Sequence, residues 1–292
     1  MHFTLRQLQI FLATAQYQTV TRAADALSMS QSAASGALRG LEQQFNVQLF
    51  DRVGKRLRLN DLGRSLLPQA EALLAQAEEF EKGISDQPSA GDLRIGATLT
   101  VGNYLAVGMI AEFRRQHPES RVELSVANTR DIASQVASYD LDAGLIEGEL
   151  RHPDLEILPW REDELVAFAA PGHPLAGSKS ISDQQVLELS WVVREPGSGT
   201  RQTFDRAMHG LLSSLDITLE LQHTEAIKRA VEAGLGVGCL SRICLQDAFA
   251  RGSLAPLNIP QRDFSRHFSI ILHRQKYRSH GLQQWLTLCL SS

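Results

Sequence analysis

The sequence predicts a small, mainly helical N-terminal domain with a β-hairpin, then a linker helix, then a large α/β domain of two lobes. Three observations predict this division. Residues 1–65 hold eight basic and four acidic residues, a net charge of +4, whereas the whole chain carries −4. Apolar residues recur at a/d spacing between residues 66 and 84. Residues 91–292 alternate short apolar runs with helical segments.

Composition excludes several classes of protein. Of the 292 residues, 43% are apolar and 21% are charged, which excludes bulk disorder. No run approaches the ~18 apolar residues that a membrane-spanning helix needs, so no membrane partner is expected. The opening MHFTLRQLQIFLATAQ lacks a basic segment before a long apolar one, so no secretory signal is expected. Three cysteines favour a reducing cytoplasm over a disulfide framework.

The first 45 residues predict three short helices. Thr4 can cap the first, and either Thr19 or Thr21 can cap a second over residues 23–27. Ser30 can cap a third over residues 31–44. Small side chains allow the last two helices to cross closely, and these are Ala23, Ala24, Ala33 and Ala34. This order, with a short turn between the second and third helices, is a helix-turn-helix.

The outward face of the third helix combines short hydrogen-bonding side chains with one long cation. These residues are Gln31, Ser32, Ser35, Gly36 and Arg39. In a major groove Gln suits adenine and Arg suits guanine. Thr21, Arg22 and Ser30 flank this face and complete the expected DNA contacts of the helices. The same residues would also suit an ordinary helix surface, so the helix alone leaves both interpretations open.

A basic hairpin follows the three helices. Leu57 and Leu59 alternate with basic or polar residues after a turn at 53–55, which predicts two short strands. Arg52, Lys55 and Arg56 lie at its tip, where cations can contact phosphates.

The run AADALSMSQSAASGALRGLEQQFNVQLFDR, with the basic strand and NDLGR after it, resembles the winged helix-turn-helix of LysR-type transcriptional regulators. The resemblance covers about sixty consecutive residues. It implies binding to double-stranded promoter DNA. Ser28 departs from the glycine that many helix-turn-helix proteins have, and Ala34 departs from the usual valine. Both changes should affect packing more than base contacts.

Residues 66–86 predict a linker helix. Its apolar positions are Leu66, Ala70, Leu73, Ala77, Phe80 and Ile84. So narrow a seam needs a partner, which is either a second chain or the body of this chain. The family resemblance favours dimerisation, with homodimers assembling into a homotetramer. Pro88 then predicts a break over residues 87–91.

Two βαβ series in residues 91–292 imply two lobes with parallel strands. The family resemblance implies that residues 87–292 form an effector-binding domain. We place lobe I at about 91–165 and 267–292, and lobe II at about 166–266. Further helices are expected at 199–212 and from about residue 279. The resemblance implies a periplasmic-binding-protein-like fold in which the strand at 267–273 and the final helix return to lobe I.

Ligands of such sheets bind at the carboxyl ends of strands. The candidates in lobe I are Thr98, Thr100, Val101, Gly102, Asn128, Thr129 and Glu147. The candidates in lobe II are Glu195, Ser198, Gly199, Thr200, Arg201, Thr224 and Glu225. Hydroxyls and free backbone N–H groups at helix starts favour an anion. Each hydroxyl could also be only a helix cap.

The runs REPGSGTR, IEG at 146–148 and EAIKRAVEAGLGVGCLSR at 225–242 resemble a branch of the same family. That branch contains the YeiE-like, CysL-like and CbbR-like proteins, and the opening MHFTLRQL is most similar to the YeiE-like group. The resemblance implies a small anionic effector, with sulfite and sulfur metabolism as the specific expectation. RNA polymerase would be a further partner if the protein is an activator. No cofactor or metal is expected.

Three alternatives remain. The glycines of GLGVG lack the spacing of a dinucleotide loop, and no catalytic motif is present, so an enzyme is not expected. A transport-type solute-binding protein would share the two-lobed architecture but not the basic head. A redox-sensing regulator would use Cys239 and Cys244, although we expect both thiols to be buried and inert.

Overall fold

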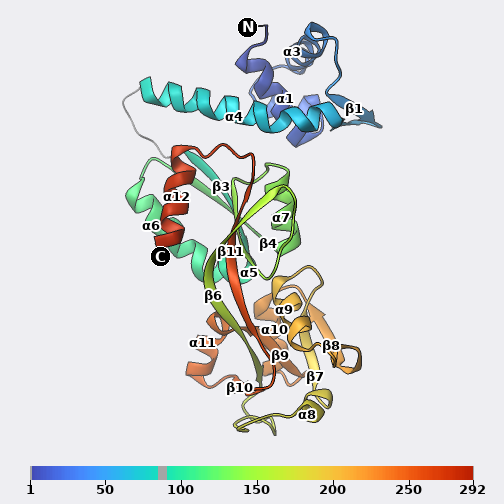
Figure 1. The fold of residues 1–292 in the computed structure, drawn as a ribbon, viewed down its shortest axis with the longest axis vertical. Coiled ribbons are helices and arrows are strands. Elements are labelled where there is room, and N and C mark those ends of the chain that lie inside the picture. Colours follow the sequence, from blue (N-terminus) through green and yellow to red (C-terminus); the bar gives the residue numbers. More distant parts are fainter. Residues whose placement is uncertain (1, 85–90, 292) are drawn as a thin grey trace. The chain divides into compact units, whose positions relative to one another are not determined.

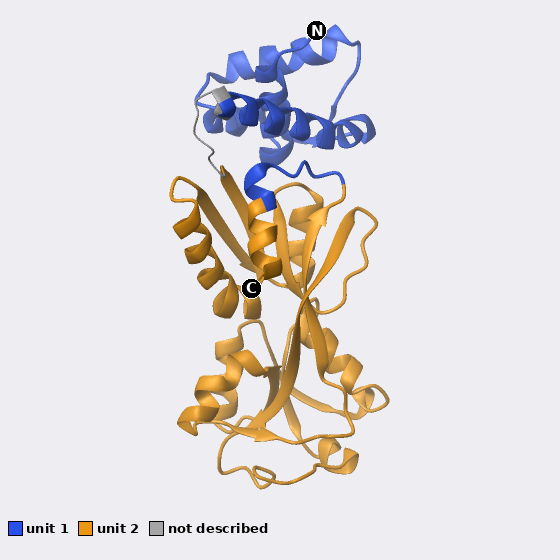
Figure 2. Ribbon diagram, turned by 60° about the vertical axis from the view of Figure 1, so that its left-hand side comes forward, with its two compact units in different colours: residues 1–89, 275–283 blue, residues 90–274, 284–292 orange. Residues whose placement is uncertain are grey.

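The structure is a computed structural model that describes residues 2–84 and 91–291. The chain divides into two compact units, residues 1–89 with 275–283, and residues 90–274 with 284–292 (Figure 2). The predicted break at 87–91 lies, apart from Gly91, outside the described residues.

Three helices form the N-terminal unit: α1 (Leu5–Tyr17), α2 (Val20–Ala26) and α3 (Gln31–Gln44) (Figure 1). Thr4, Thr19 and Ser30 cap them, as predicted. The second helix begins three residues earlier than the predicted 23–27, because Thr19 rather than Thr21 is its cap. Ala23, Ala24 and Ala34 are fully buried where the helices cross, whereas Ala33 is exposed, so it does not contribute to that crossing.

The hairpin is antiparallel, with β1 (Phe50–Val53) paired to β2 (Arg56–Leu59). Gly54 in the two-residue turn has a φ of 62°, a conformation that glycine adopts without strain. Leu49 and Phe50 are buried in the core of this unit and hold the hairpin against the helices.

The linker helix α4 spans Asp61–Ile84, so it begins before residue 66. Ala70 and Leu74 are buried in the N-terminal core. Leu73 and Phe80 of the predicted seam are 45% and 73% exposed. This part of the seam therefore has no cover within the described residues of the chain.

Lobe I contains three parallel strands in the order β4 (Arg121–Ala127), β3 (Asp92–Thr98) and β5 (Ala143–Glu147). One continuous helical stretch follows β3, and it consists of α5 (Leu99–Val101), the π-helical η1 (Gly102–Ala106) and α6 (Val107–Gln116). Helix α7 (Thr129–Ala137) covers the other face of these strands, where Ile132 packs on Gly96 and Gly144.

Lobe II repeats the arrangement with β8 (Asp216–Leu221), β7 (Ser190–Arg194) and β9 (Val237–Ser241) in parallel. Its helical segments are α8 (Asp183–Leu187), α9 (Gly199–Ala207), η2 (Leu212–Ser214), α10 (Thr224–Glu232) and α11 (Arg242–Arg251). The helix predicted over 199–212 therefore ends at Ala207. A short strand β10 (Ala255–Leu257) pairs with β6 (Leu155–Ala169).

Two long antiparallel strands connect the lobes: β6 (Leu155–Ala169), which was not predicted from the sequence, and β11 (Ser265–His273) (Figure 1). They join both lobes into one sheet of nine strands. Strand β11 pairs with β5 of lobe I, whereas residues 275–283, also expected in lobe I, belong to the first compact unit. The final helix α12 (His280–Ser291) places Trp285 against Phe113 of α6.

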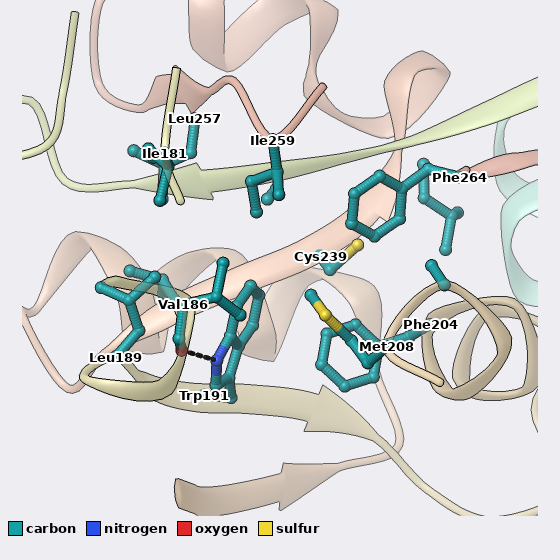
Figure 3. Close-up of a cluster of buried hydrophobic side chains, with 14 of the residues drawn as sticks. Ile181, Val186, Leu189, Trp191, Phe204, Met208, Cys239, Leu257, Ile259 and Phe264 are labelled. Atoms are coloured by element: carbon teal, nitrogen blue, oxygen red, sulfur yellow. Dashed lines mark hydrogen bonds between the residues drawn. The ribbon is translucent and has the colours of Figure 1, made fainter. Parts of the chain in front are cut away.

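A cluster of buried apolar side chains forms a core of lobe II and packs on one face of β7 (Figure 3). Trp191 on β7 packs against Phe204 of α9, and its indole N–H donates to the Val186 carbonyl at 3.3 Å. Val192 points to the other face, where it packs with Ile227 of α10. Helices α9 and α10 thus cover opposite faces, and both begin near the carboxyl ends of the strands.

Candidate functional site

Helix α3 presents a polar face to solvent. Ala34, Leu38 and Leu41 are buried, so the opposite face of the helix is turned outward. Gln31, Ser32 and Arg39 are exposed and Ser35 is half-buried. The Arg39 Nε donates to the Ser35 carbonyl at 3.2 Å. Ser30 contributes its hydroxyl to the cap, at 3.2 Å from the Ala33 backbone nitrogen.

The other predicted DNA contacts lie on the same unit and are exposed. They are Thr21 and Arg22 at the start of α2, and Arg52, Lys55 and Arg56 on the hairpin. The structure therefore leaves all these polar groups accessible to a polyanion.

In the second unit, a buried ion cluster joins the two lobes. Arg266 on β11 donates to Glu147 of β5 at 2.9 Å and to Asp163 of β6 at 2.6 Å. Its third nitrogen donates to the Thr200 hydroxyl of α9 at 3.0 Å. Ser241 of β9 donates to Asp163 at 2.7 Å. All three charged side chains are at most 2% exposed.

The carboxylates of the cluster favour the charged form of Arg266. Burial alone would lower the pKa of its guanidinium, but the charges of Glu147 and Asp163 outweigh burial and raise the pKa. One cation thus faces two carboxylates, and each polar atom of the guanidinium has a partner.

A second group of polar side chains adjoins this cluster. The Thr100 hydroxyl hydrogen-bonds the Cys244 thiol, and the Cys244 carbonyl accepts from Lys228 of α10 at 3.2 Å. Lys228 also pairs with Glu225 at 2.5 Å. Tyr104 of η1 donates to Glu225 at 3.0 Å, so it bridges the lobes. Burial, and next the charge of Glu147, raise the pKa of Cys244 to about 12.

Three buried polar atoms have no hydrogen-bond partner among the described residues: the hydroxyls of Thr98 and Thr224 and the Nη1 of Arg194. Their residues are 1–2% exposed. Arg194 lies on the same face of β7 as Val192, the face that α10 covers. Thr224 is the first residue of α10, whose N-terminus has no side-chain cap. These three residues, the ion cluster of Arg266 and the polar group around Lys228 together form the interlobe cluster.

The structure brings the predicted Thr98, Thr100, Glu147, Thr200, Thr224 and Glu225 into or beside the interlobe cluster. Glu195 joins it through its pair with Arg194, at 2.7 Å. Thr129 donates its hydroxyl to the Glu147 carbonyl at 2.9 Å, and Gly199 packs on that same carbonyl.

The other predicted residues have structural partners elsewhere. Asn128 caps α7 through the Asp131 nitrogen at 3.0 Å, and Ser198 caps α9 through the Thr200 nitrogen at 3.2 Å. Val101 is fully buried and Gly102 packs against Val126 of β4. Arg201 pairs with Asp205 and Glu220, and its Nη1 donates to the Arg194 carbonyl at 2.9 Å.

Several residues of the interlobe cluster were not predicted, above all Tyr104, Asp163, Lys228 and Arg266. Asp163 and Arg266 lie in connecting strands whose pairing is antiparallel and long-range. The sequence signal for Arg266 was its position as a charged residue beside the apolar residues of SRHFSII. Among the described residues, no group of three or more His, Cys, Asp or Glu side chains could hold a metal ion. No helix in the described ranges is long and apolar enough to cross a membrane.

Comparison with known proteins defines the class. Residues 5–64 match the bacterial regulatory helix-turn-helix protein, lysR family, and residues 86–292 match the LysR substrate binding domain. The chain therefore belongs to the LysR family of transcriptional regulators, with a DNA-binding helix-turn-helix and an effector-binding domain.

Relatives and solved structures agree with this assignment. The chain is 43% identical to the HTH-type transcriptional regulator YeiE of Escherichia coli K12, over 99% of this chain and 98% of that one. It is 35% identical to a probable RuBisCO transcriptional regulator of Synechocystis, over 95% and 83%. The CcmR regulatory domain of Synechocystis in complex with 2-PG has a TM-score of 0.64 at 28% identity, over 69% and 96%. A full-length OxyR variant of Pseudomonas aeruginosa has a TM-score of 0.75 at 23% identity, over 99% and 96%.

Membership of the LysR family excludes two of the three alternatives. These relatives are transcriptional regulators, so the protein is neither an enzyme nor a transport-type binding protein. The redox alternative lacks support from the thiols, because Cys239 and Cys244 are each 2% exposed. Burial also raises the pKa of both, which disfavours the reactive thiolate.

Proposed function

We propose that this cytoplasmic regulator binds a small oxyanion at the start of α10 and that the anion controls its binding to promoter DNA. The observation that carries the proposal is the unpartnered Nη1 of Arg194, a buried group that can only donate. A buried donor without an acceptor is costly, and an anion would supply that acceptor. The unpartnered Thr224 hydroxyl and the uncapped backbone of α10, the helix that packs on this face of β7, supply further donors.

The charge distribution supports this place over Arg266. Arg266 already faces two carboxylates, so a ligand anion there would meet net negative charge. On the proposed side Arg194 and Lys228 each pair with one carboxylate, that of Glu195 and that of Glu225, so the charges there balance. Sulfite is the first candidate, from the resemblance to the YeiE-like group. The 2-PG complex of CcmR makes phosphorylated acids and sugars the next candidates.

The hydroxyls allow a sharp test. The Thr98 and Thr224 hydroxyls make no hydrogen bond within the described residues, so Thr98→Val and Thr224→Val should not lower the free energy of unfolding. The same changes should weaken oxyanion binding roughly 10- to 100-fold each, the value of a hydrogen bond to a charged group. Titration calorimetry of the full chain with sulfite, sulfate, inorganic phosphate and 2-PG measures this.

Thr203→Val is the matched control. Its hydroxyl donates to the Gly199 carbonyl inside lobe II at 3.0 Å, so its loss should cost stability without affecting affinity. If none of the four anions binds the wild-type chain, the oxyanion proposal is wrong. If phosphate or 2-PG binds and sulfite does not, only the sulfite assignment is wrong.

For DNA, we propose that Gln31, Ser32, Ser35 and Arg39 contact bases in the major groove. Thr21, Arg22 and Ser30 would support that contact, and Arg52, Lys55 and Arg56 would contact phosphates. The exposed polar face of α3 supports this assignment. Arg39→Ala should reduce discrimination between a selected duplex and its scrambled form by ~1–3 kcal/mol. Arg114→Ala, an exposed cation of α6, is the control, and equal discrimination by both variants would remove Arg39 from base recognition.

We further propose that α4 dimerises through Leu73 and Phe80, and that dimers pair into a tetramer. The exposure of both side chains supports the first step. A dimer presents two DNA-binding domains to two half-sites, and RNA polymerase would be the next partner if the protein activates transcription.

A further inference from the structure

The two lobes of the effector domain touch on both faces of the sheet, and the two contacts differ in kind. On the α7 face, α9 packs against the end of β5 through the backbone. A Cβ at Gly199 would lie 1.9 Å from the Glu147 carbonyl oxygen. Gln202 donates to the Glu149 carbonyl at 3.0 Å and accepts from the Glu149 nitrogen at 2.8 Å. Because backbone atoms meet so closely here, α9 cannot shift along the end of β5 without a steric clash.

On the opposite face, η1 meets α10 through side-chain ends. Tyr104 donates its hydroxyl to Glu225 at 3.0 Å, and Lys228 lies 3.5 Å from the same hydroxyl. The Glu225 side chain is 61% exposed, so water can replace Tyr104 as its partner. This contact can therefore break while the α9–β5 contact remains.

The position of Tyr104 depends on a local irregularity of its helix. Residues 102–106 form a π-helical turn between α5 and α6, which inserts an extra residue into the helix. Gly102 at its start lies so close to β4 that a Cβ would be 2.9 Å from the Val126 side chain. The turn directs Tyr104 towards α10, and π-turns of this kind occur frequently at functional sites.

We propose that Tyr104, Glu225 and Lys228 form a latch between the lobes, with the α9–β5 contact as the pivot. Opening would rotate lobe II about the pivot and break the Tyr104–Glu225 hydrogen bond. The β-bulge of β6 and β11 between Phe268 and Ser269 provides a bend in the connecting strands for this motion. The latch sets the open fraction of the free chain, and hence how far any effector can shift it.

The latch is tested by a distance measurement that needs no ligand, so failure of the oxyanion proposal leaves the test intact. Spin labels at Glu119→Cys in lobe I and Lys179→Cys in lobe II report lobe separation in the full chain, since both positions are exposed. The native cysteines are buried and stay unlabelled. Double electron–electron resonance then gives the distribution of distances.

Tyr104→Phe should raise the ratio of open to closed chains about five-fold, the effect of one lost hydrogen bond. Glu225→Ala should shift the distribution in the same direction. Tyr139→Phe is the matched control, because the Tyr139 hydroxyl bonds His273 within lobe I at 2.6 Å. The control should match the wild type. Unchanged distributions for both Tyr104→Phe and Glu225→Ala, or an equal change in Tyr139→Phe, would overturn the latch.

Discussion

Replacing Arg266 with methionine should destabilise the effector domain more than the same substitution at an exposed arginine. The side chain is 2% exposed and lies between Glu147 and Asp163, which are 1% and 2% exposed. Methionine fills much of the same space but leaves two buried carboxylates without their cation. Breaking a buried pair in this way costs about 3–5 kcal/mol.

Urea unfolding followed by tryptophan emission measures this cost in the full chain. All three tryptophans, Trp160, Trp191 and Trp285, lie in the effector domain, so their emission follows that domain. Arg229→Met is the matched control. It removes the same charge from a pair in which the arginine is 78% exposed, and it should cost less than about 1 kcal/mol.

The two unpaired carboxylates lead to two further expectations. Adding Glu147→Gln and Asp163→Asn to Arg266→Met removes the unpaired charges and should recover most of the loss. The single variant should also recover stability in acid, because unpaired buried carboxylates have raised folded-state pKa values and bind protons more readily when folded. A loss no larger than that of Arg229→Met would refute the role of the buried cation.

Three other predictions concern packing, assembly and pH. Gly199→Ala should cost ~1–3 kcal/mol, because its Cβ would meet the Glu147 carbonyl, whereas Gly108→Ala in α6, with nothing within 4 Å, should gain ~0.5–1 kcal/mol in the same urea assay. Equal effects would contradict the close contact. If α4 dimerises as proposed, Leu73→Asp should give a monomer in analytical ultracentrifugation, and Glu78→Lys, off the apolar seam, should leave the dimer intact. The buried Cys244 thiol has its pKa raised from 9.0 to about 12, so its contribution to stability is complete below pH 9 and is lost as pH rises towards 12. Cys244→Ala should make the urea midpoint fall less over that range, and an unchanged slope would argue against a buried, protonated thiol.

The N-terminal unit was predictable because its signals are local. Thr4 and Ser30 cap helices within a few residues of themselves, and the two-residue turn at Gly54 brings together strands that are adjacent in sequence. Most strands of the effector domain were predictable for the same reason, since each is a short apolar run. Strands β6 and β10 were not predicted, and α9 ends earlier than predicted. Strand β6 is not a simple apolar run. Its middle pairs with β11 where the lobes join, and there it mixes charged and apolar residues.

The sequence by itself determined the class of protein, the two lobes and most of the hydroxyls near the interlobe cluster. Only the tertiary structure decided which charges meet. Glu147 and Arg266 are 119 residues apart and touch because β5 and β11 are neighbours, and Tyr104 reaches Glu225 across 121 residues. Capping depends on a few adjacent residues, whereas ion pairing depends on where strands from distant parts of the chain are placed. Arg201, next to Thr200 in sequence, therefore pairs with Asp205 and Glu220, while Arg266 lies at the centre of the interlobe cluster.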